Sequence, residues 1–491
     1  MRRPNGKMQN IDIKFASLNL GLISPEMVLL VGGILILILG GLFKQRAIIV
    51  YTALVTLLGG LILSIGAWNN PESGFYGMVQ VDNFSIFFKI IFILASSLTL
   101  LMARQYLIRW DIERFEFYSL LLFSTVGMMT MASSVDLIVI FLGLEIMSVP
   151  LYVMAGFARR DPLSNEAGIK YFIMGAFATG FLLYGIALIY GASGTTNLRQ
   201  IVADFGFLQT HSALPLYIGA GLVLVGFGFK VAAVPFHMWV PDVYQGAPTP
   251  ITAFFSVAPK AAGFASLFRI FAFGFSGIPE MTSLLWLLAI LTMSVGNILA
   301  LYQDNIKRML AYSSIAHAGY ILIALTVKGE GAVSAALYYL LAYTFFNLGA
   351  FTIVTMVDSR ARSQALIHEM RGLSIRHPYL AALLALFLLA LAGFPPTAGF
   401  LGKFYIFSEA VKGGYIWLAI IGVINSLVSV YYYLRIVVAA YFDQRETEFQ
   451  PVTYTPALRL VLFITAAGTL ILGLWPQYFL HLTRINMFPF I

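Results

Sequence analysis

Long apolar runs recur along the whole chain and constrain its fold more than any other feature. A helix needs about 20 apolar residues to cross the hydrocarbon core of a bilayer. Such runs occur at fourteen places, and the polar segments between them are mostly short. Within lipid, a helix satisfies its own backbone hydrogen bonds. The pattern therefore predicts an all-α, polytopic membrane protein with about fourteen transmembrane helices.

We expect the fourteen helices at residues 24–43, 47–67, 83–103, 116–132, 135–157, 166–190, 214–236, 249–273, 281–302, 306–327, 331–357, 379–409, 413–442 and 456–480. Only 11% of the residues are charged, against roughly 25% in soluble domains, which excludes a soluble globule. The chain has no cysteine, which excludes disulfides, cysteine-ligated zinc and iron–sulfur clusters bound by the chain itself.

Glycine and proline predict that the seventh and twelfth helices are broken. Gly226 and Gly228 precede Lys230 in the seventh, and Pro235 follows it; the twelfth contains "LALAGFPPTAGFLGKF". Broken helices in corresponding positions of two halves are typical of transporters, where the freed backbone groups line a polar cavity. We therefore expect two inverted five-helix repeats, formed by helices four to eight and nine to thirteen.

This reading divides the chain into four parts. Residues 1–115 hold helices one to three, residues 116–273 the first repeat, residues 281–442 the second repeat, and residues 443–491 the last helix. We expect a hairpin or re-entrant loop at 68–84 and a surface helix within 358–378.

Basic residues set the expected orientation, because lysine and arginine collect on the cytoplasmic side of membrane helices. One face has fourteen in its connections: Lys44, Arg46, Arg104, Arg109, Arg114, Arg159, Arg160, Lys307, Arg308, Arg360, Arg362, Arg371, Arg376 and Arg445. The other face has five, namely Arg199, Arg269, Lys328, Lys412 and Arg484. The first face is therefore expected in the cytoplasm and both termini outside. The leading "MRRPNGK" opposes this assignment, unless the chain starts at Met8.

Four charged side chains fall inside predicted helices and away from the helix ends: Glu145, Lys230, Lys260 and Lys403. A charge at the bilayer centre costs about 2.5–3.5 kcal/mol on insertion scales, so retained charges usually serve ion or proton pathways. A buried lysine stays charged beside a carboxylate and gives up its proton more readily without one. We expect Glu145 to lie within reach of Lys230. The alternative is an ion pair that only holds helices together.

Other polar residues are open to two interpretations. Lys170 is either a functional group or the partner of Glu166 one helical turn away. His317 is either a proton relay or a contact between helices. We expect Lys307 and Arg308 to anchor a helix at the cytoplasmic surface and His237 to lie at the interface. Snorkelling to the interface is the default expectation for Lys89, Glu409 and Arg435.

Four segments resemble the antiporter-like, proton-translocating membrane subunits of respiratory complex I and their Mrp-antiporter relatives. They are "FLGLEIMSVPLYVMAGF", "KVAAVPFHMWVPDVYQGAPTPITAFFSVAPKAA", "NIKRMLAYSSIAHAGY" and "LAGFPPTAGFLGKF". The resemblance covers roughly residues 80–440. Lys260, where the L and M relatives tend to have histidine, and Lys403, where M has glutamate, make the chain similar to the N branch.

The resemblance implies roles for six residues. Glu145 and Lys230 would form the coupling pair with Lys170 beside them, Lys260 would be the central relay and His317 a bridge, and Lys403 would exchange protons with the outside. It implies a bacterial inner-membrane location. The expected partners are neighbouring membrane subunits of the M and K types and the lipid bilayer, and no nucleic acid is expected to bind. NADH, FMN, iron–sulfur clusters and quinone would belong to other subunits, and this chain would bind no cofactor or metal.

Three other functions use similar features. An Mrp-type Na⁺/H⁺ antiporter subunit would have the same fold and charges, and so would the membrane subunit of a proton-pumping hydrogenase. A purely structural scaffold would keep the fold without using the charges. The lysines on helices eight and twelve favour the complex I branch.

Overall fold

The computed structural model describes residues 19–43, 46–275, 277–358, 365–442 and 454–484. Within these residues, thirteen helices are long and apolar enough to cross a membrane. The all-α polytopic fold predicted from the apolar runs is confirmed. Lys44, Arg360, Arg362, Arg445 and the leading segment with Met8 lie outside the described residues.

The membrane-length helices of the N-terminal part and first half are α1 (Ser24–Leu42), α2 (Arg46–Gly66), α3 (Asn83–Arg109), α4 (Phe115–Ser133), α5 (Leu137–Ala155), α6 (Pro162–Ser193), α9 (Ala213–Val231) and α11 (Thr249–Leu267). A π-helical turn, η4 (Phe268–Gly274), continues α11. The later ones are α12 (Pro279–Leu301), α13 (Ile306–Val327), α14 (Gly329–Val357), α18 (Ile416–Tyr441) and α19 (Pro456–Leu474).

The remaining elements are short. They are the 3-10 turns η2 (Leu20–Ile23), η3 (Phe75–Gly77) and η5 (Ile367–Met370), the strands β1 (Glu72–Gly74) and β2 (Val79–Val81), and the helices α7 (Leu198–Ala203), α8 (Phe205–His211), α10 (Trp239–Gly246), α15 (Leu373–Arg376), α16 (Pro378–Ala392), α17 (Ala398–Lys412) and α20 (Pro476–Leu482). The antiparallel pair β1–β2 forms the hairpin expected at 68–84. In the connection expected to hold a surface helix, the described part contains only η5 and α15.

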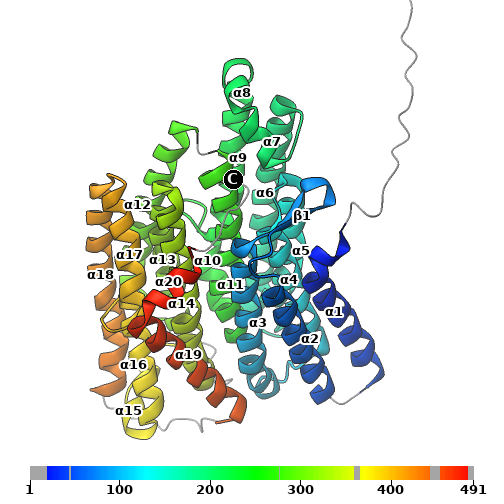
Figure 1. Cartoon of the computed structure of the whole chain (residues 1–491). Helices are drawn as coiled ribbons and strands as arrows, with labels where there is room; N and C mark the ends of the chain where they lie inside the picture. The colour runs from blue at the N-terminus through cyan, green and yellow to red at the C-terminus, as the bar shows by residue number, and fades with distance from the viewer. Residues whose placement is uncertain (1–18, 44–45, 276, 359–364, 443–453, 485–491) are drawn as a thin grey trace, which may run out of the picture.

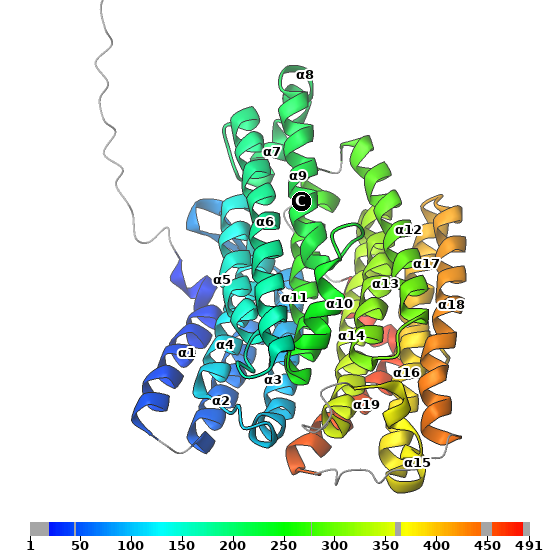
Figure 2. The ribbon, with the colours of Figure 1, turned by 180° about the vertical axis from the view of Figure 1, so that it is seen from behind.

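The long helices run side by side in one elongated bundle (Figure 1). Helices α1 and α2 lie at one end and α16–α18 at the other, with α11 between them; the view from behind shows the same order (Figure 2). All nineteen residues of α11 are buried, whereas α1 and α2 expose many large apolar side chains, as lipid-facing helices do. Along the direction of the helices, the hairpin and α7–α8 lie towards the top of the view and α15 lies at the bottom (Figure 1).

Both predicted helix breaks are present. The seventh helix stops at Val231, where Ala232 takes a left-handed backbone (φ 64°), and resumes as α10. The twelfth stops at Ala392, where Gly393 has φ 90°, and resumes as α17. Each half of the twelfth has fifteen residues, which is why thirteen rather than fourteen continuous spans are found. The fourteen predicted crossings are therefore thirteen long helices and one pair of half-helices.

Several helix ends differ from the predicted bounds. α3 continues to Arg109 and α6 begins at Pro162, so both helices extend beyond their apolar runs. Their extra turns are polar, and Asp161 caps the start of α6 by accepting a hydrogen bond from the Leu163 N–H. A search for apolar runs misses such turns because they lie where the helix emerges from the membrane.

Candidate functional site

The predicted lysine of the first half, Lys230, lies in an aromatic box at the end of α9. Its side chain is 4% exposed, and its Nζ lies 5.4, 5.3 and 5.9 Å from the ring centres of Tyr152, Tyr171 and Phe229. Nζ makes no hydrogen bond to any described residue. The ring faces attract a cation, but they do not replace the hydrogen bonds that a buried ammonium loses.

Aromatic stacking fixes this box to the helix break. Tyr171 of α6 stacks on Trp239, the first residue of α10, with ring centres 4.4 Å apart and planes 7° from parallel. The indole of Trp239 donates a hydrogen bond back to the Phe229 carbonyl at 3.0 Å. Both half-helices of the break are thus held against the same tyrosine, next to Lys230.

Glu145 does not form the direct ion pair with Lys230 that we expected. Its carboxylate on α5 accepts a hydrogen bond from Thr179 of α6 at 3.0 Å and is only partly buried. Glu145 lies on the same helix as Tyr152, whose ring centre is 5.4 Å from the Lys230 Nζ. Within the described residues, the two charged groups are separated by more than the 4.0 Å of an ion pair.

Lys170 takes the position expected of a helical ion pair and adds a second partner. Its Nζ lies 2.6 Å from Glu166 and 2.6 Å from Asp242 of α10. Arg308 of α13 binds the other oxygen of Asp242, also at 2.6 Å. Burial alone would raise the pKa of Asp242, but the hydrogen bonds from Lys170 and Arg308 hold it below its usual value. The second half of the broken helix thus joins α6 to α13 through one carboxylate.

The central lysine, Lys260, lies within the fully buried α11. It is 3% exposed, and its Nζ donates a hydrogen bond of 2.5 Å to the backbone carbonyl of Ser314 on α13. One turn further along α11, a Cβ added to Gly263 would lie 2.8 Å from Cγ1 of Val231 and 3.5 Å from the Cβ of Lys230. Glycine at this position therefore lets α11 approach the end of α9. Lys260 lies one helical turn from this close approach.

His317 is held by tyrosines at both ring nitrogens. Its Nδ1 lies 2.5 Å from the hydroxyl of Tyr339 on α14, and its Nε2 lies 3.0 Å from the hydroxyl of Tyr433 on α18. The Tyr433 hydroxyl also bonds to Ser313, the neighbour of the residue that accepts from Lys260. The histidine thus connects three helices, so the structure contains the interhelical contact and leaves the relay role as a proposal.

Lys403 lies on α17, next to the second helix break. Its Nζ donates to the carbonyls of Leu391 and Ala392, at 3.1 and 2.9 Å, and to Ser426 Oγ at 2.9 Å. Those carbonyls end α16, where the interruption leaves them without intrahelical donors and the helix dipole favours a cation. The Tyr320 ring centre, on the His317 helix, lies 5.0 Å from Nζ. A cavity of about 390 Å³ lies beside Lys403 and Ser426.

Lys260, His317 and Lys403 therefore lie in one row of buried polar residues, which we call the ladder. Lys230 and Glu145 lie in a separate region beside the ladder. Sequence reasoning missed Tyr320, Tyr339 and Tyr433, which complete the ladder. Buried tyrosines look like ordinary apolar core in a sequence, although each hydroxyl can both donate and accept a proton. The clusters "LYYLLAYT" and "VYYYLR" were the available signal for Tyr339 and Tyr433.

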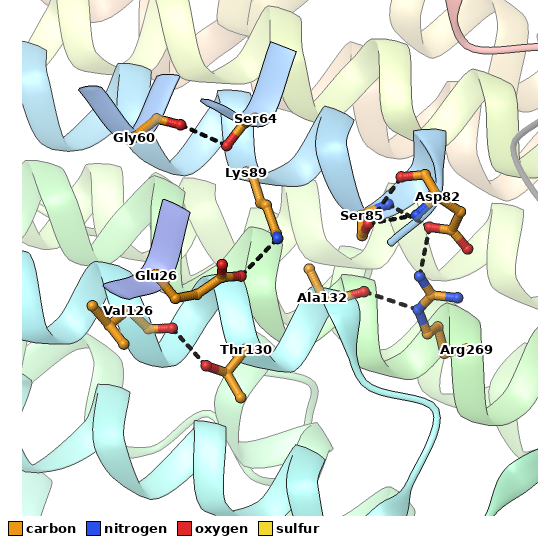
Figure 3. A network of polar contacts seen from close by, with 10 residues as sticks. All are labelled: Glu26, Gly60, Ser64, Asp82, Ser85, Lys89, Val126, Thr130, Ala132 and Arg269. Atoms are coloured by element: carbon orange, nitrogen blue, oxygen red, sulfur yellow. Dashed lines mark hydrogen bonds and ion pairs between the residues drawn. The ribbon is translucent and has the colours of Figure 1, made fainter. Parts of the chain in front are cut away.

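Two buried ion pairs near the hairpin were also missed (Figure 3). Lys89 is 1% exposed and lies 2.7 Å from Glu26 of α1, so the expectation that it snorkels is wrong. Arg269 of η4 lies 2.8 Å from Asp82 and donates to the Ala132 carbonyl at 2.9 Å. Both pairs join segments far apart in the sequence, which a single helix pattern cannot show.

Lys307 also differs from its expected role. It is 6% exposed and donates to the Ala247 carbonyl at 2.7 Å, so it does not anchor at the surface. Nearby Asp358 accepts from Thr249 at 2.6 Å. Burial raises the pKa of Asp358, which Lys307 and Thr249 partly offset. His237, expected at the interface, is 6% exposed and therefore buried.

Comparison with known proteins places the chain. The family described as NADH:quinone oxidoreductase/Mrp antiporter, transmembrane, matches residues 134–429. A protein of Trichlorobacter lovleyi named NADH-quinone oxidoreductase subunit N is 49% identical, over 97% of this chain and 98% of its own. One of Rhizobium meliloti, named subunit N 2 of the same enzyme, is 43% identical, over 94% and 97%.

Solved structures agree with this placement. A chain of respiratory complex I from Thermus thermophilus, in a structure with bound aureothin, superposes with a TM-score of 0.81 at 35% identity, covering 93% of this chain and 98% of that one. A chain of the Mrp complex from Dietzia shares the fold, with a TM-score of 0.81 at 22% identity, covering 95% and 96%. The sequence identities favour the complex I branch, and the chain belongs to the NADH-quinone oxidoreductase subunit N family.

Proposed function

We propose that this chain translocates protons as a membrane-arm subunit of a bacterial NADH:quinone oxidoreductase. The observation that carries the proposal is the ladder of Lys260, Tyr433, His317 and Lys403, which runs through the bundle from α11 to the break between α16 and α17. The relatives are named as subunits of NADH-quinone oxidoreductase, so the redox reaction that drives translocation would be NADH oxidation by quinone. The chain has no cysteine to ligate a cluster, and NADH, FMN, iron–sulfur clusters and quinone are assigned to other subunits.

The ladder suits proton transfer because its members exchange protons readily. A histidine between two hydroxyls can accept a proton at one nitrogen and release one from the other. The carbonyl that binds Lys260 cannot relay a proton, so that step uses the Ser313 and Tyr433 hydroxyls or a water molecule. A second water would join His317 to Lys403, where Tyr320 presents its ring face.

In the first half, the charge of Glu145 would control when Lys230 releases its proton; we call this the control step. Glu145, on the same helix as Tyr152 of the aromatic box, would act on Lys230 through its negative charge, because the Lys230 ammonium has no hydrogen-bond partner among the described residues. Loss of that charge would make the ammonium still less stable. Its proton would then pass towards Lys260 across the close approach at Gly263. Lys170 would act from the surface side through Asp242, which links it to Arg308.

Orientation, repeats and neighbours complete the proposal. Both termini would lie on the periplasmic side, in agreement with the fourteen-to-five distribution of basic residues. The two breaks share a left-handed residue and a following proline, which supports inverted repeats at 116–273 and 281–442. The adjoining subunits would be of the M and K types.

The deciding experiment replaces Lys230 by alanine in the assembled complex, reconstituted into vesicles. We expect NADH oxidation to build almost no pH gradient, because the control step has lost its proton. Lys412→Ala is the matched control, since Lys412 is an exposed lysine paired with Glu409. Wild-type pumping by the Lys230→Ala complex would instead show that the buried charges only support the structure.

A further inference from the structure

A groove of about 660 Å³ lies away from the proton path, between the ends of α1, α4 and α5. Its charged lining consists of Arg114, Arg159, Arg160, Asp111 and Glu116, and its apolar lining includes Leu37, Leu120, Phe123, Val153 and Phe157. We call it the arginine groove. The ladder residues Lys260, His317 and Lys403 are not part of its lining.

The three arginines of the groove are available to a ligand. All three are exposed, and within the described residues none of the guanidinium groups has an ion-pair or hydrogen-bond partner. Arg114 is the N-cap residue of α4, and its side chain makes no capping bond there. The first N–H groups of α4 therefore add their positive helix end to the same groove.

Apolar surface lies directly beside these charges. Leu37 of α1 is 39% exposed and Val153 of α5 is 48% exposed, although both line the groove. Phe123 of α4 packs beside Gly33 of α1, where an added Cβ would lie 2.5 Å from its ring. The wall below the arginines is thus a fixed apolar surface in a crevice between membrane helices.

The groove has the depth of a lipid headgroup. α1 ends at Leu42, α4 begins at Phe115 and α5 ends at Ala155, so the arginines lie just beyond the ends of three membrane-length helices. The apolar lining residues lie inside those helices. A molecule that fits must carry negative charge at the helix ends and hydrocarbon below them.

We propose that the arginine groove binds an anionic phospholipid. The phosphate lies among Arg114, Arg159 and Arg160, where guanidinium groups bind phosphate oxygens in a bidentate manner, and an acyl chain lies along Leu37 and Val153. Asp111 and Glu116 leave one excess positive charge in the lining, which favours an anionic headgroup over a zwitterionic one. Basic pockets between membrane helices on the cytoplasmic side bind such headgroups.

The test measures lipid retained by the assembled complex in nanodiscs containing equal parts of phosphatidylglycerol and phosphatidylcholine. Native mass spectrometry would compare wild type, the triple variant Arg114→Gln, Arg159→Gln, Arg160→Gln, and the single variants Arg159→Gln and Arg160→Gln. We expect the triple variant to lose phosphatidylglycerol about tenfold or more, from the roughly additive contribution of each basic residue. Arg376→Gln, an exposed arginine expected on the same face and outside the groove, should retain it.

Three results would overturn the proposal. The triple variant could retain as much phosphatidylglycerol as wild type, or the wild type could hold both lipids equally. Inorganic phosphate added to the mixed nanodiscs could displace the bound phosphatidylglycerol, which would identify a free-phosphate site. The single variants remove exposed side chains only, so an intermediate loss in each would support the site even if the triple variant failed to assemble.

Discussion

The two lysines at the two helix breaks have opposite environments. Lys403 donates three hydrogen bonds, two of them to the carbonyls that its own break leaves free. Lys230 is as deeply buried, but its Nζ has aromatic rings around it and no hydrogen-bond partner among the described residues. The same residue type at the same kind of interruption is therefore stabilised in one half and left unstable in the other.

This difference assigns different tasks to the two halves. A buried charge without hydrogen bonds is costly, so Lys230 responds to small changes in the charge of Glu145. Three hydrogen-bond acceptors stabilise the Lys403 ammonium and fix its position. Lys403 therefore suits the last site of the proton path.

Lys403→Met should abolish pumping and also lower the melting temperature of the purified complex. The Leu391 and Ala392 carbonyls would lose their donor inside the bundle, and each unsatisfied buried group costs about 1–3 kcal/mol. Differential scanning fluorimetry beside a pumping assay measures both effects. Lys412→Met, on the same helix but exposed, should leave both values unchanged. A normal melting temperature for Lys403→Met would remove the contrast between the two lysines.

Lys230→Met should abolish pumping without lowering the melting temperature. Methionine fills a similar volume and removes a charge that lacked hydrogen bonds, so the free energy of unfolding should stay constant or rise by about 1–2 kcal/mol. The same pair of assays applies. A clear fall in melting temperature would mean that Lys230 contributes to stability as Lys403 does.

Tyr339→Phe should slow pumping severalfold, because His317 loses its Nδ1 partner. Tyr338→Phe is the matched control: the adjacent tyrosine donates its hydroxyl to the Leu472 carbonyl at 2.7 Å, away from the ladder. Each variant loses one hydrogen bond, worth about 0.5–1.5 kcal/mol, so their melting temperatures should fall together. Equal pumping rates in the two variants would exclude Tyr339 from the path.

Asp242→Asn should have the smallest effect, confined to the acid side. The pKa of Asp242 is lowered in the folded state, so its stabilising contribution is complete above the unfolded value of about 3.9 and disappears as the pH falls through the lowered value. The side chain is 34% exposed, which limits the contribution to below about 1 kcal/mol. Melting temperatures measured from pH 7 down to the acid limit should fall less steeply in the variant. Parallel curves would count against the link.

The sequence predicted what depends on one helix at a time. Apolar runs located the crossings, and glycine and proline located both breaks, because these features act locally. The mid-helix charges of Lys260 and Lys403 stood out for the same reason. The Tyr433 and Tyr339 bonds to His317 depend on which helices become neighbours, and no single run contains that information.

The misplaced residues show the same limit. Lys89 and Lys307 lie near helix ends, where snorkelling is the usual outcome, but each found a partner on another helix. Glu145 was expected within reach of Lys230, yet Glu145 accepts a hydrogen bond from Thr179 and Lys230 lies among aromatic rings. The family resemblance could suggest these roles without supplying the distances.

The three oxygens around Lys403 allow it to change protonation state without moving. A neutral amine has two N–H groups and one lone pair, so it can still donate to both carbonyls of α16 but can no longer donate to a third oxygen. The third oxygen belongs to Ser426, whose hydroxyl can rotate and donate to that lone pair instead. In the charged state the same hydroxyl is free to point to the Ala392 carbonyl, 3.4 Å away. The direction of one hydroxyl group would thus record whether the last lysine holds its proton.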